Sequence, residues 1–188
     1  MFIRSERLFL RPGWPEDWEE LLGGIADEAV VRNLAQAPWP YTADDARAFL
    51  RQPQDPRLPN FFVTLPTSAA PAEIIGGIAL MRGESGAELG YWIAPDHWGQ
   101  GYATEATRAV LGLARTLGHR RVTAGPFTDN PASARVLRKA GFRPTGEMRA
   151  CYSRARGRTV PAAIHAIELG EPGSCDGGDD GVPAMRAA

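Results

Sequence analysis

The sequence contains few cysteines and few histidines, and none of them is arranged as a metal site. Cys151 and Cys175 have neither metal-ligand spacing nor the pattern of a secreted disulfide framework, so reduced thiols are expected. His97, His119 and His165 share no metal-ligand spacing with one another or with the cysteines. The sequence therefore predicts no metal.

Long apolar runs and basic runs are also missing. The longest apolar run, residues 74–81, is far shorter than the roughly 20 residues that a membrane-spanning helix requires. The first residues do not form a signal-peptide pattern. The net charge is −1 and no basic run is present, so a surface that binds nucleic acid through its phosphates is not expected. These absences predict a cytoplasmic protein with no nucleic-acid partner and no membrane partner.

The chain does contain enough apolar sequence for one domain of ordinary size. It has 188 residues, of which 44% are hydrophobic, and such a chain can bury a substantial core. After Gly170 the composition shifts to Gly, Asp, Pro and Ala, with few large apolar side chains. We expect a single domain over residues 1–169 and a disordered C-terminal tail over residues 170–188.

A strand, a glycine loop and a helix form the centre of the prediction. Residues 87–94 predict a buried strand, and the apolar residues of the segment 103–117 recur with helical period. Between the two, Gly99 and Gly101 permit backbone angles and a close approach that a side chain would block. The first helical turn leaves N–H groups unpaired, which favours an anion such as a diphosphate. A plain tight turn would explain the two glycines equally well.

The rest of the chain alternates between strand and helix signals. Helices are predicted over residues 15–25, after Thr42 with Asp45 in a capping box, and after Asn130 with Pro131 at the first helical position. An exposed turn is expected over residues 153–159. Strands are predicted near residues 7–11, 60–65, 73–81, 87–94, 121–127, 142–149 and 162–169.

Several motifs occur together and in one order. The loop Gly-Gln-Gly-Tyr-Ala-Thr-Glu-Ala (99–106) follows Glu-Leu-Gly-Tyr-Trp (88–92), and Asn-Pro-Ala-Ser (130–133) and Lys-Ala-Gly-Phe (139–142) come later. The chain opens with Ser-Glu-Arg-Leu-Phe-Leu-Arg-Pro (5–12) and also contains Trp-Pro-Tyr-Thr (39–42). Over roughly residues 5–169 it resembles the GNAT superfamily of acetyl-CoA-dependent N-acetyltransferases. The closest branch is the RimJ/RimL type, whose members acetylate amines including ribosomal-protein N-termini.

The resemblance implies an α/β (α+β) fold with a central mixed, mostly antiparallel twisted sheet of about seven strands and helices on both faces. It also implies acetyl-CoA as co-substrate, with its pantetheine between the strands 88–94 and 121–127, which would splay after Gly90-Tyr91. Trp98 stands where the superfamily often has Gln or Arg, so phosphate contacts are expected from the loop backbone. The implied cofactor-binding residues are Tyr91, Trp92, Ile93, Trp98, Gly99, Gln100, Gly101, Tyr102, Ala103, Thr104, Asn130 and Ser133.

The reaction implied is direct attack of a primary amine on the thioester in a ternary complex. Glu88 lies at a position resembling the superfamily's strand-borne general base and would also contact the acceptor, although a salt bridge at a strand edge explains it equally well. Ser133 is the candidate acid, because Leu137 occupies the position at which many relatives carry a tyrosine. Trp39 and Tyr41 are candidate acceptor contacts, or else residues that pack their loop onto the core.

Two other functions fit parts of the sequence. A non-catalytic acyl-CoA sensor would keep the loop and lose turnover, and Leu137 keeps that alternative open. A nucleotide-binding oxidoreductase would use the same loop, but Thr104 replaces the third glycine of its fingerprint and no acidic residue ends the next strand. The acceptor could be a small-molecule or a peptide amine, and the protein a monomer or a homodimer.

Overall fold

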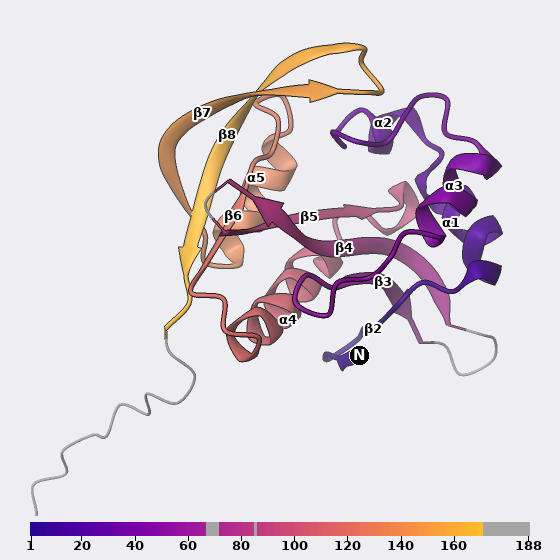
Figure 1. Ribbon diagram of the computed structural model, residues 1–188, viewed down its shortest axis with the longest axis horizontal. Helices are drawn as coiled ribbons and strands as arrows, with labels where there is room; N and C mark the ends of the chain where they lie inside the picture. The colour runs from indigo at the N-terminus through magenta and orange to yellow at the C-terminus, as the bar shows by residue number, and fades with distance from the viewer. Residues whose placement is uncertain (67–71, 85, 171–188) are drawn as a thin grey trace, which may run out of the picture.

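The computed structural model describes residues 1–66, 72–84 and 86–170 of the protein. Within these residues, one sheet of eight strands has the order β1-β2-β3-β4-β5-β6-β8-β7 (Figure 1). Neighbouring strands are antiparallel except β5 and β6, which are parallel. The predicted mixed, mostly antiparallel sheet is confirmed. The strands are β1 (Ile3–Arg4), β2 (Phe9–Arg11), β3 (Asn60–Leu65), β4 (Glu73–Gly83), β5 (Gly86–Ile93), β6 (Arg121–Ala124), β7 (Arg143–Ser153) and β8 (Arg158–Glu168).

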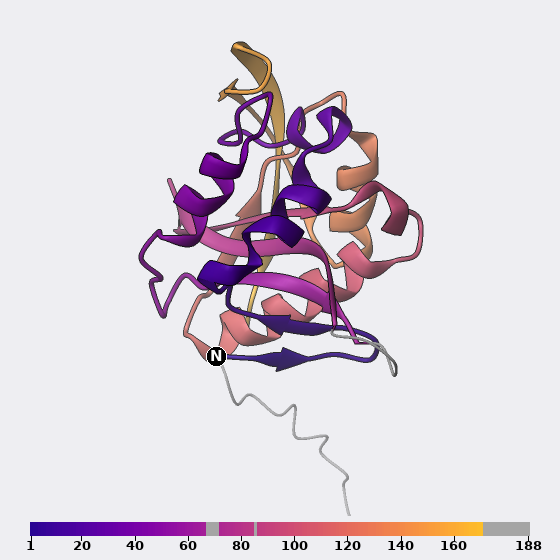
Figure 2. The same ribbon diagram turned by 90° about the vertical axis from the view of Figure 1, so that its right-hand side faces the viewer.

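Helices cover both faces of this sheet, as expected (Figures 1 and 2). None of the helices in the described part of the chain has both the length and the apolar composition of a membrane span. The predicted tail from residue 171 onward, which includes Cys175, lies outside the described residues. The helices are α1 (Trp18–Ile25), α2 (Glu28–Val31), α3 (Ala43–Leu50), α4 (Tyr102–Thr116) and α5 (Pro131–Lys139), with the 3-10 helices η1 (Pro15–Asp17) and η2 (Pro95–His97).

Local signals set the ends of the helices. The hydroxyl of Thr42 accepts the Asp45 N–H, and the Asp45 carboxylate accepts the Thr42 N–H at 2.9 Å, which is the predicted capping box at the start of α3. The Asn130 side chain caps α5, and Pro131 follows it. Gly118 lies just beyond α4 with φ +84°, a backbone angle that favours glycine. These starts and ends are confirmed.

The two faces of the sheet bury separate apolar clusters. Side chains alternate along a strand, and in β3 the neighbours Phe61 and Phe62 accordingly belong to different clusters. Phe61 packs in the larger cluster, with residues of α4 and α5 such as Val110. Phe62 packs in the smaller cluster, with residues of α1 and α3 such as Leu21 and Ala46. We call these two sides the α4/α5 face and the α1–α3 face.

Four details differ from the prediction. The two-residue strand β1 is an addition, and it is too short to show alternation in the sequence. The short helix α2 was not expected. Strand β6 ends at Ala124, and Pro126, which has no N–H group, follows soon after it. Strands β7 and β8 are longer than predicted, because most of β7 is exposed and polar residues conceal its period.

Candidate active site

The loop between β5 and α4 has the backbone that the two glycines suggest. Gly99 has φ +76° and Gly101 has φ +85°, a region that L side chains rarely adopt. Gly101 is the N-cap of α4, and no side chain caps that helix. A Cβ on Gly99 would meet no atom within 4 Å, so the loop is open on that side. The first N–H groups of α4 are therefore available to an anion approaching the loop.

The side chain of Trp98 forms a hydrogen bond with the end of β5 and so stabilises the loop. Its indole N–H donates to the Ile93 carbonyl oxygen at 2.6 Å, which ties the start of the loop to the end of β5. The Gln100 amide donates to the Asp96 carbonyl oxygen at 3.3 Å. Since the indole N–H is already bonded, Trp98 does not offer it to a ligand, and this agrees with the expectation that the loop main chain is the donor.

An ion pair between the β1–β2 connection and α4 also supports the loop. The Arg7 guanidinium donates to the Glu105 carboxylate at 2.8 Å and to the Gln100 carbonyl oxygen at 3.1 Å. The Ser5 hydroxyl donates to Glu105 at 2.7 Å. Burial opposes the ionised form of Glu105, but the hydrogen bonds from the Arg7 backbone, Ser5 and the Arg7 side chain hold its pKa below the ordinary value. Arg7 and Glu105 both belong to the quoted motifs, yet nothing in those motifs indicates that they form a pair.

Strands β5 and β6 separate next to this loop. Their parallel ladder consists of Ala87 opposite Val122 and Glu88 opposite Thr123, so it ends two residues before Gly90. The splay therefore begins earlier than predicted. Strand β5 continues beside β4 as far as Ile93.

The exposed backbone groups of β5 follow from its pairing with β4. The Ala94 N–H donates to the Ile75 carbonyl oxygen at 2.8 Å. Along an antiparallel pair, the N–H groups of one strand point alternately toward the partner strand and away from it. The N–H groups of Tyr91 and Ile93 therefore point away from β4, into the gap where β6 has separated from β5. The N–H of Trp92 points toward β4, and its ring packs in the cluster of the α1–α3 face. Of these three predicted residues, two therefore present a main-chain donor to the gap.

A pair of hydroxyl groups connects β5 to the start of α5 on the α4/α5 face. The Tyr91 hydroxyl lies 2.7 Å from the Ser133 hydroxyl. Asn130 accepts the Ser133 N–H at 3.2 Å, so the start of α5 is fixed at the same place. Burial raises the pKa of Tyr91 to about 12, and the hydrogen bond with Ser133 opposes this shift. Leu137, one helical turn further, is fully buried in the apolar core and carries no hydroxyl.

Glu88 lies on the opposite face of β5 from Tyr91, because the two residues are three positions apart. The Arg149 guanidinium, on β7, donates to Glu88 Oε2 at 2.9 Å, and the side chains are 22% exposed for Glu88 and 26% for Arg149. The hydrogen bond to Glu88 raises the pKa of Arg149. The salt bridge, one of the two explanations of Glu88 offered by the sequence, is thus present. The other carboxylate oxygen, Glu88 Oε1, has no hydrogen bond within the described residues.

The two predicted aromatic contacts of the loop before α3 differ in burial. Tyr41 is 9% exposed and packs in the cluster of the α1–α3 face. Burial, followed by the charge of Asp45, raises the pKa of Tyr41 to about 12. Trp39 is 41% exposed. Tyr41 therefore packs its loop onto the core, and Trp39 is the aromatic side chain that an acceptor could reach.

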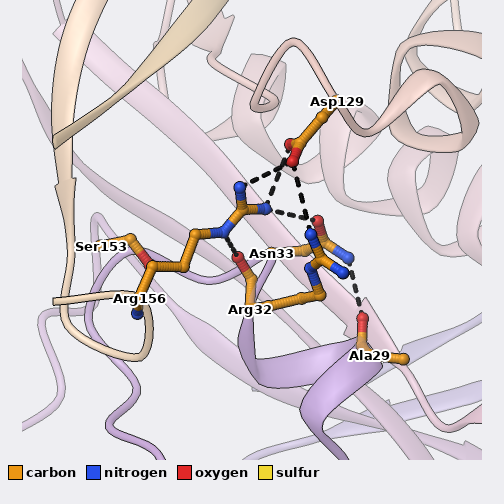
Figure 3. A network of polar contacts seen from close by, with 6 residues as sticks. All are labelled: Ala29, Arg32, Asn33, Asp129, Ser153 and Arg156. Atoms are coloured by element: carbon orange, nitrogen blue, oxygen red, sulfur yellow. Dashed lines mark hydrogen bonds and ion pairs between the residues drawn. The ribbon is translucent and has the colours of Figure 1, made fainter. Parts of the chain in front are cut away.

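Arginines fasten the β7–β8 hairpin to the α1–α3 face, and Figure 3 shows the network. Arg156 lies in the hairpin turn, and its guanidinium donates to both carboxylate oxygens of Asp129, at 2.7 and 3.1 Å. It also donates to the Arg32 carbonyl oxygen at 2.7 Å and to Asn33 Oδ1 at 3.4 Å. The hydrogen bond from Arg156 holds the pKa of Asp129 below its usual range.

This network corrects the prediction of an exposed turn over residues 153–159. Four of these residues are exposed, but the Arg156 side chain is only 8% exposed. The Arg154 N–H donates to the Ala35 carbonyl oxygen at 2.9 Å, so the main chain of the turn is bound to the same segment. Since Asp129 directly precedes Asn130, the hairpin also supports the start of α5. Three arginines around a glycine gave no indication of these distant partners.

The chain is similar to known acetyltransferases in sequence and in structure. Residues 7–143 match the family model described as the acetyltransferase (GNAT) domain. The uncharacterised N-acetyltransferase YnaD of Bacillus subtilis (strain 168) is 28% identical over 154 residues, which cover 80% of this chain and 88% of YnaD. A GNAT-family acetyltransferase from Bacillus anthracis superposes with a TM-score of 0.76 at 27% identity, covering 90% of this chain and 99% of the other.

RimL, a ribosomal alpha-N-protein acetyltransferase solved in complex with coenzyme A, is also similar in structure. Its TM-score is 0.73 at 18% identity, covering 90% of this chain and 98% of RimL. A likeness at this level of identity shows a common fold.

Proposed function

The chain belongs to the GNAT family of acetyltransferases, and we propose that it moves the acetyl group of acetyl-CoA to a primary amine by direct attack in a ternary complex. The observation that carries this proposal is the uncapped start of α4 behind Gly99 and Gly101, beside the gap between β5 and β6. We place the diphosphate at the loop and an extended pantetheine in the gap. Acetyl-CoA would supply the activated acetyl group.

We infer a specific binding arrangement for the coenzyme. The main-chain N–H groups of residues 99–104 hold the diphosphate. The N–H groups of Tyr91 and Ile93 face the gap and bond the pantetheine as an added strand would. They also polarise the thioester carbonyl, on whose oxygen negative charge develops during attack. The side-chain oxygen of Asn130 caps α5, so its amide hydrogens are left to donate to the pantetheine.

One side chain is assigned to proton transfer and another to stabilising the leaving thiolate. An alkyl ammonium has a pKa near 10.4, so most acceptors must lose a proton at neutral pH before their nitrogen can attack. Glu88 accepts that proton at Oε1, directly or through water, while Arg149 holds Oε2. As the carbon–sulfur bond breaks, its electron pair goes to sulfur, and the Ser133 hydroxyl donates a hydrogen bond to the thiolate.

The acceptor enters from the α1–α3 face, on which Glu88 and the exposed Trp39 lie. RimL supports a RimJ/RimL-type assignment, in which the acceptor is the N-terminus of a protein, and the opening motif of residues 5–12 agrees with it. We therefore propose peptide N-termini first and small-molecule amines second. Three further points stay predictions: a single domain over residues 1–169, a monomeric or homodimeric protein, and a cytoplasmic location.

The proposed reaction is tested by release of free thiol from acetyl-CoA in the presence of a panel of peptides and amines, with mass spectrometry of the product. We expect acetylation of at least one acceptor. Binding of acetyl-CoA without thiol release from any acceptor would support the non-catalytic sensor instead. Quenching of tryptophan fluorescence by NADH but not by acetyl-CoA would support an oxidoreductase.

The role of Glu88 has its own test. Glu88→Gln keeps the shape and removes the proton acceptor, so kcat should fall about a hundredfold. The loss should be largest at low pH, where fewer acceptor amines are already deprotonated. An unchanged pH–rate profile would assign Glu88 to the salt bridge alone.

A further inference from the structure

The Tyr91 hydroxyl is partly buried beside the proposed thioester position, and the binding arrangement above gives it no role. The Tyr91 side chain crosses from β5 to the start of α5, while its own N–H group faces the gap between β5 and β6. Its hydroxyl lies 2.7 Å from Ser133 Oγ, in a contact in which either group can donate, and it also faces the Ser133 carbonyl oxygen as a donor at the longer distance of 3.4 Å. No other tyrosine among the described residues is bonded to a residue of α5.

The geometry points to Tyr91 as a positioning residue for the departing thiolate: its phenol donates to Ser133 Oγ and thereby turns the Ser133 hydrogen toward the sulfur. This inference rests on the proposed function. It assigns the side chain of Tyr91, whereas the binding arrangement above uses only its backbone.

The direction of the hydrogen bond follows from charge. Each hydroxyl has one hydrogen, and a sulfur that gains the electron pair of the broken carbon–sulfur bond attracts the hydrogen of the nearer hydroxyl. Ser133 then needs its own oxygen stabilised, and the phenol is placed to donate to it. Consecutive hydrogen bonds of this kind polarise and strengthen one another in a buried site.

The phenol keeps its proton throughout. Burial raises the pKa of Tyr91 to about 12, so the group remains a donor across any assay at neutral or moderately alkaline pH. A thiol has a reference pKa near 8.5, and an aliphatic hydroxyl is a much weaker acid, so Ser133 stabilises the thiolate by a hydrogen bond without complete proton transfer. Solvent supplies the proton when coenzyme A is released. The Tyr91–Ser133 pair would thus supply the hydroxyl donor that the fully buried Leu137 cannot provide.

The first experiment is a double-mutant cycle in steady-state kinetics. Tyr91→Phe removes the hydroxyl and keeps the ring, and we expect kcat to fall about tenfold with little change in KM for acetyl-CoA. Ser133→Ala should reduce kcat at least as much, and the double variant should be no slower than Ser133→Ala alone. If the two losses multiply, Tyr91 does not act through Ser133. Tyr152→Phe, at an exposed tyrosine on β7, is the matched control and should leave kcat unchanged.

The second experiment requires neither an acceptor nor turnover. The ultraviolet absorbance of the thiolate reports the pKa of the coenzyme A thiol when it is bound to the protein. That pKa should be about one unit higher in Tyr91→Phe than in the original chain, because a weaker hydrogen bond stabilises the thiolate less. Equal values with coenzyme A bound would overturn the role of Tyr91 and leave the proposed function intact. Failure of the original chain to bind coenzyme A would overturn both.

Discussion

The two faces of strand β5 are held by contacts of different range. On the α4/α5 face, the glycine loop and the cap of α5 are built from residues close together in the chain, as when Asn130 caps Ser133 three residues on. On the α1–α3 face, Arg149 reaches Glu88 across 61 residues and Arg156 reaches Asn33 across 123. The glycine turn and the helix cap assigned to the coenzyme are thus specified mainly by local contacts, to which the long-range contacts Arg7–Glu105 and Tyr91–Ser133 are added. The face assigned to the acceptor depends on long-range contacts.

This difference suggests how specificity divides between the faces. A local loop can bind the same coenzyme in many chains, whereas a hairpin held by long-range arginine contacts can change its shape with few substitutions. Changes to the loop should therefore reduce coenzyme affinity, and changes to the arginine network should affect stability and acceptor binding. Four substitutions test this division and the direct reaction proposed for the site.

The largest effect is expected for Gly101→Val. A β-branched residue at φ +85° is strained by about 1–3 kcal/mol, and the loop would leave its binding conformation to relieve it. We expect calorimetry to show coenzyme A binding weakened by about tenfold to a hundredfold. Gly118→Val is the matched control, since Gly118 has φ +84° at the other end of α4. It should lower stability without changing coenzyme affinity, and equal losses of affinity in both variants would contradict the assignment of the loop.

Arg156→Met should have the next largest effect, on stability rather than on coenzyme binding. The variant loses four hydrogen bonds of a guanidinium that is only 8% exposed. Because Asp129 is 46% exposed and water can replace part of the pair, we expect the free energy of unfolding to fall by about 2 kcal/mol. Urea denaturation measures this change in the free energy of unfolding. Arg158→Met, at an exposed position of the same hairpin, should change it little, and similar losses in the two variants would mean that the network contributes nothing specific.

Glu105→Gln should have a smaller effect that depends on pH. The folded protein holds the pKa of Glu105 below its ordinary value, so the ionised side chain stabilises the fold above the unfolded value of about 4.3 and loses this contribution as pH falls through the folded value. We expect a loss of about 1 kcal/mol at neutral pH, shrinking as the pH falls below 4. Glu6→Gln, at an exposed carboxylate, is the control. A difference that stays constant down to the acid limit would show that the charge of Glu105 is not the cause.

The smallest effect is expected for Cys151→Ala. Burial, followed by the charge of Glu88, raises the pKa of the Cys151 thiol, with Arg149 acting in the opposite direction. The thiol is therefore protonated at neutral pH and is a poor nucleophile. Turnover should stay near normal if the amine attacks the thioester directly. A large loss, or an acetylated Cys151 in mass spectra of the stalled reaction, would indicate a covalent route.

The sequence predicted those features that neighbouring residues determine. Thr42 with Asp45, Asn130 with Pro131, and Gly118 each mark a helix end through contacts a few residues long, and all three were located correctly. Strand β3 was predicted with its observed ends, because its buried residues contrast with the prolines on either side.

Other features depend on partners that the sequence does not identify. Arg7 and Glu105 are 98 residues apart, and neither motif indicates that they meet. Tyr91 was expected to contribute its backbone, and its contact with Ser133 depends on how β5 crosses the start of α5. Strand β7 is exposed along most of its length, so no alternation of apolar residues marked its ends.

The central claim is that main-chain N–H groups of residues 99–104 bind the diphosphate of coenzyme A. Amide NMR spectra of the ¹⁵N-labelled protein, recorded during titration with coenzyme A and separately with pantetheine, test it most directly. We predict that the amide signals of Gly99, Gly101 and the first turn of α4 shift strongly with coenzyme A and hardly at all with pantetheine. Unchanged signals at these residues, with the large shifts elsewhere in the protein, would contradict the account.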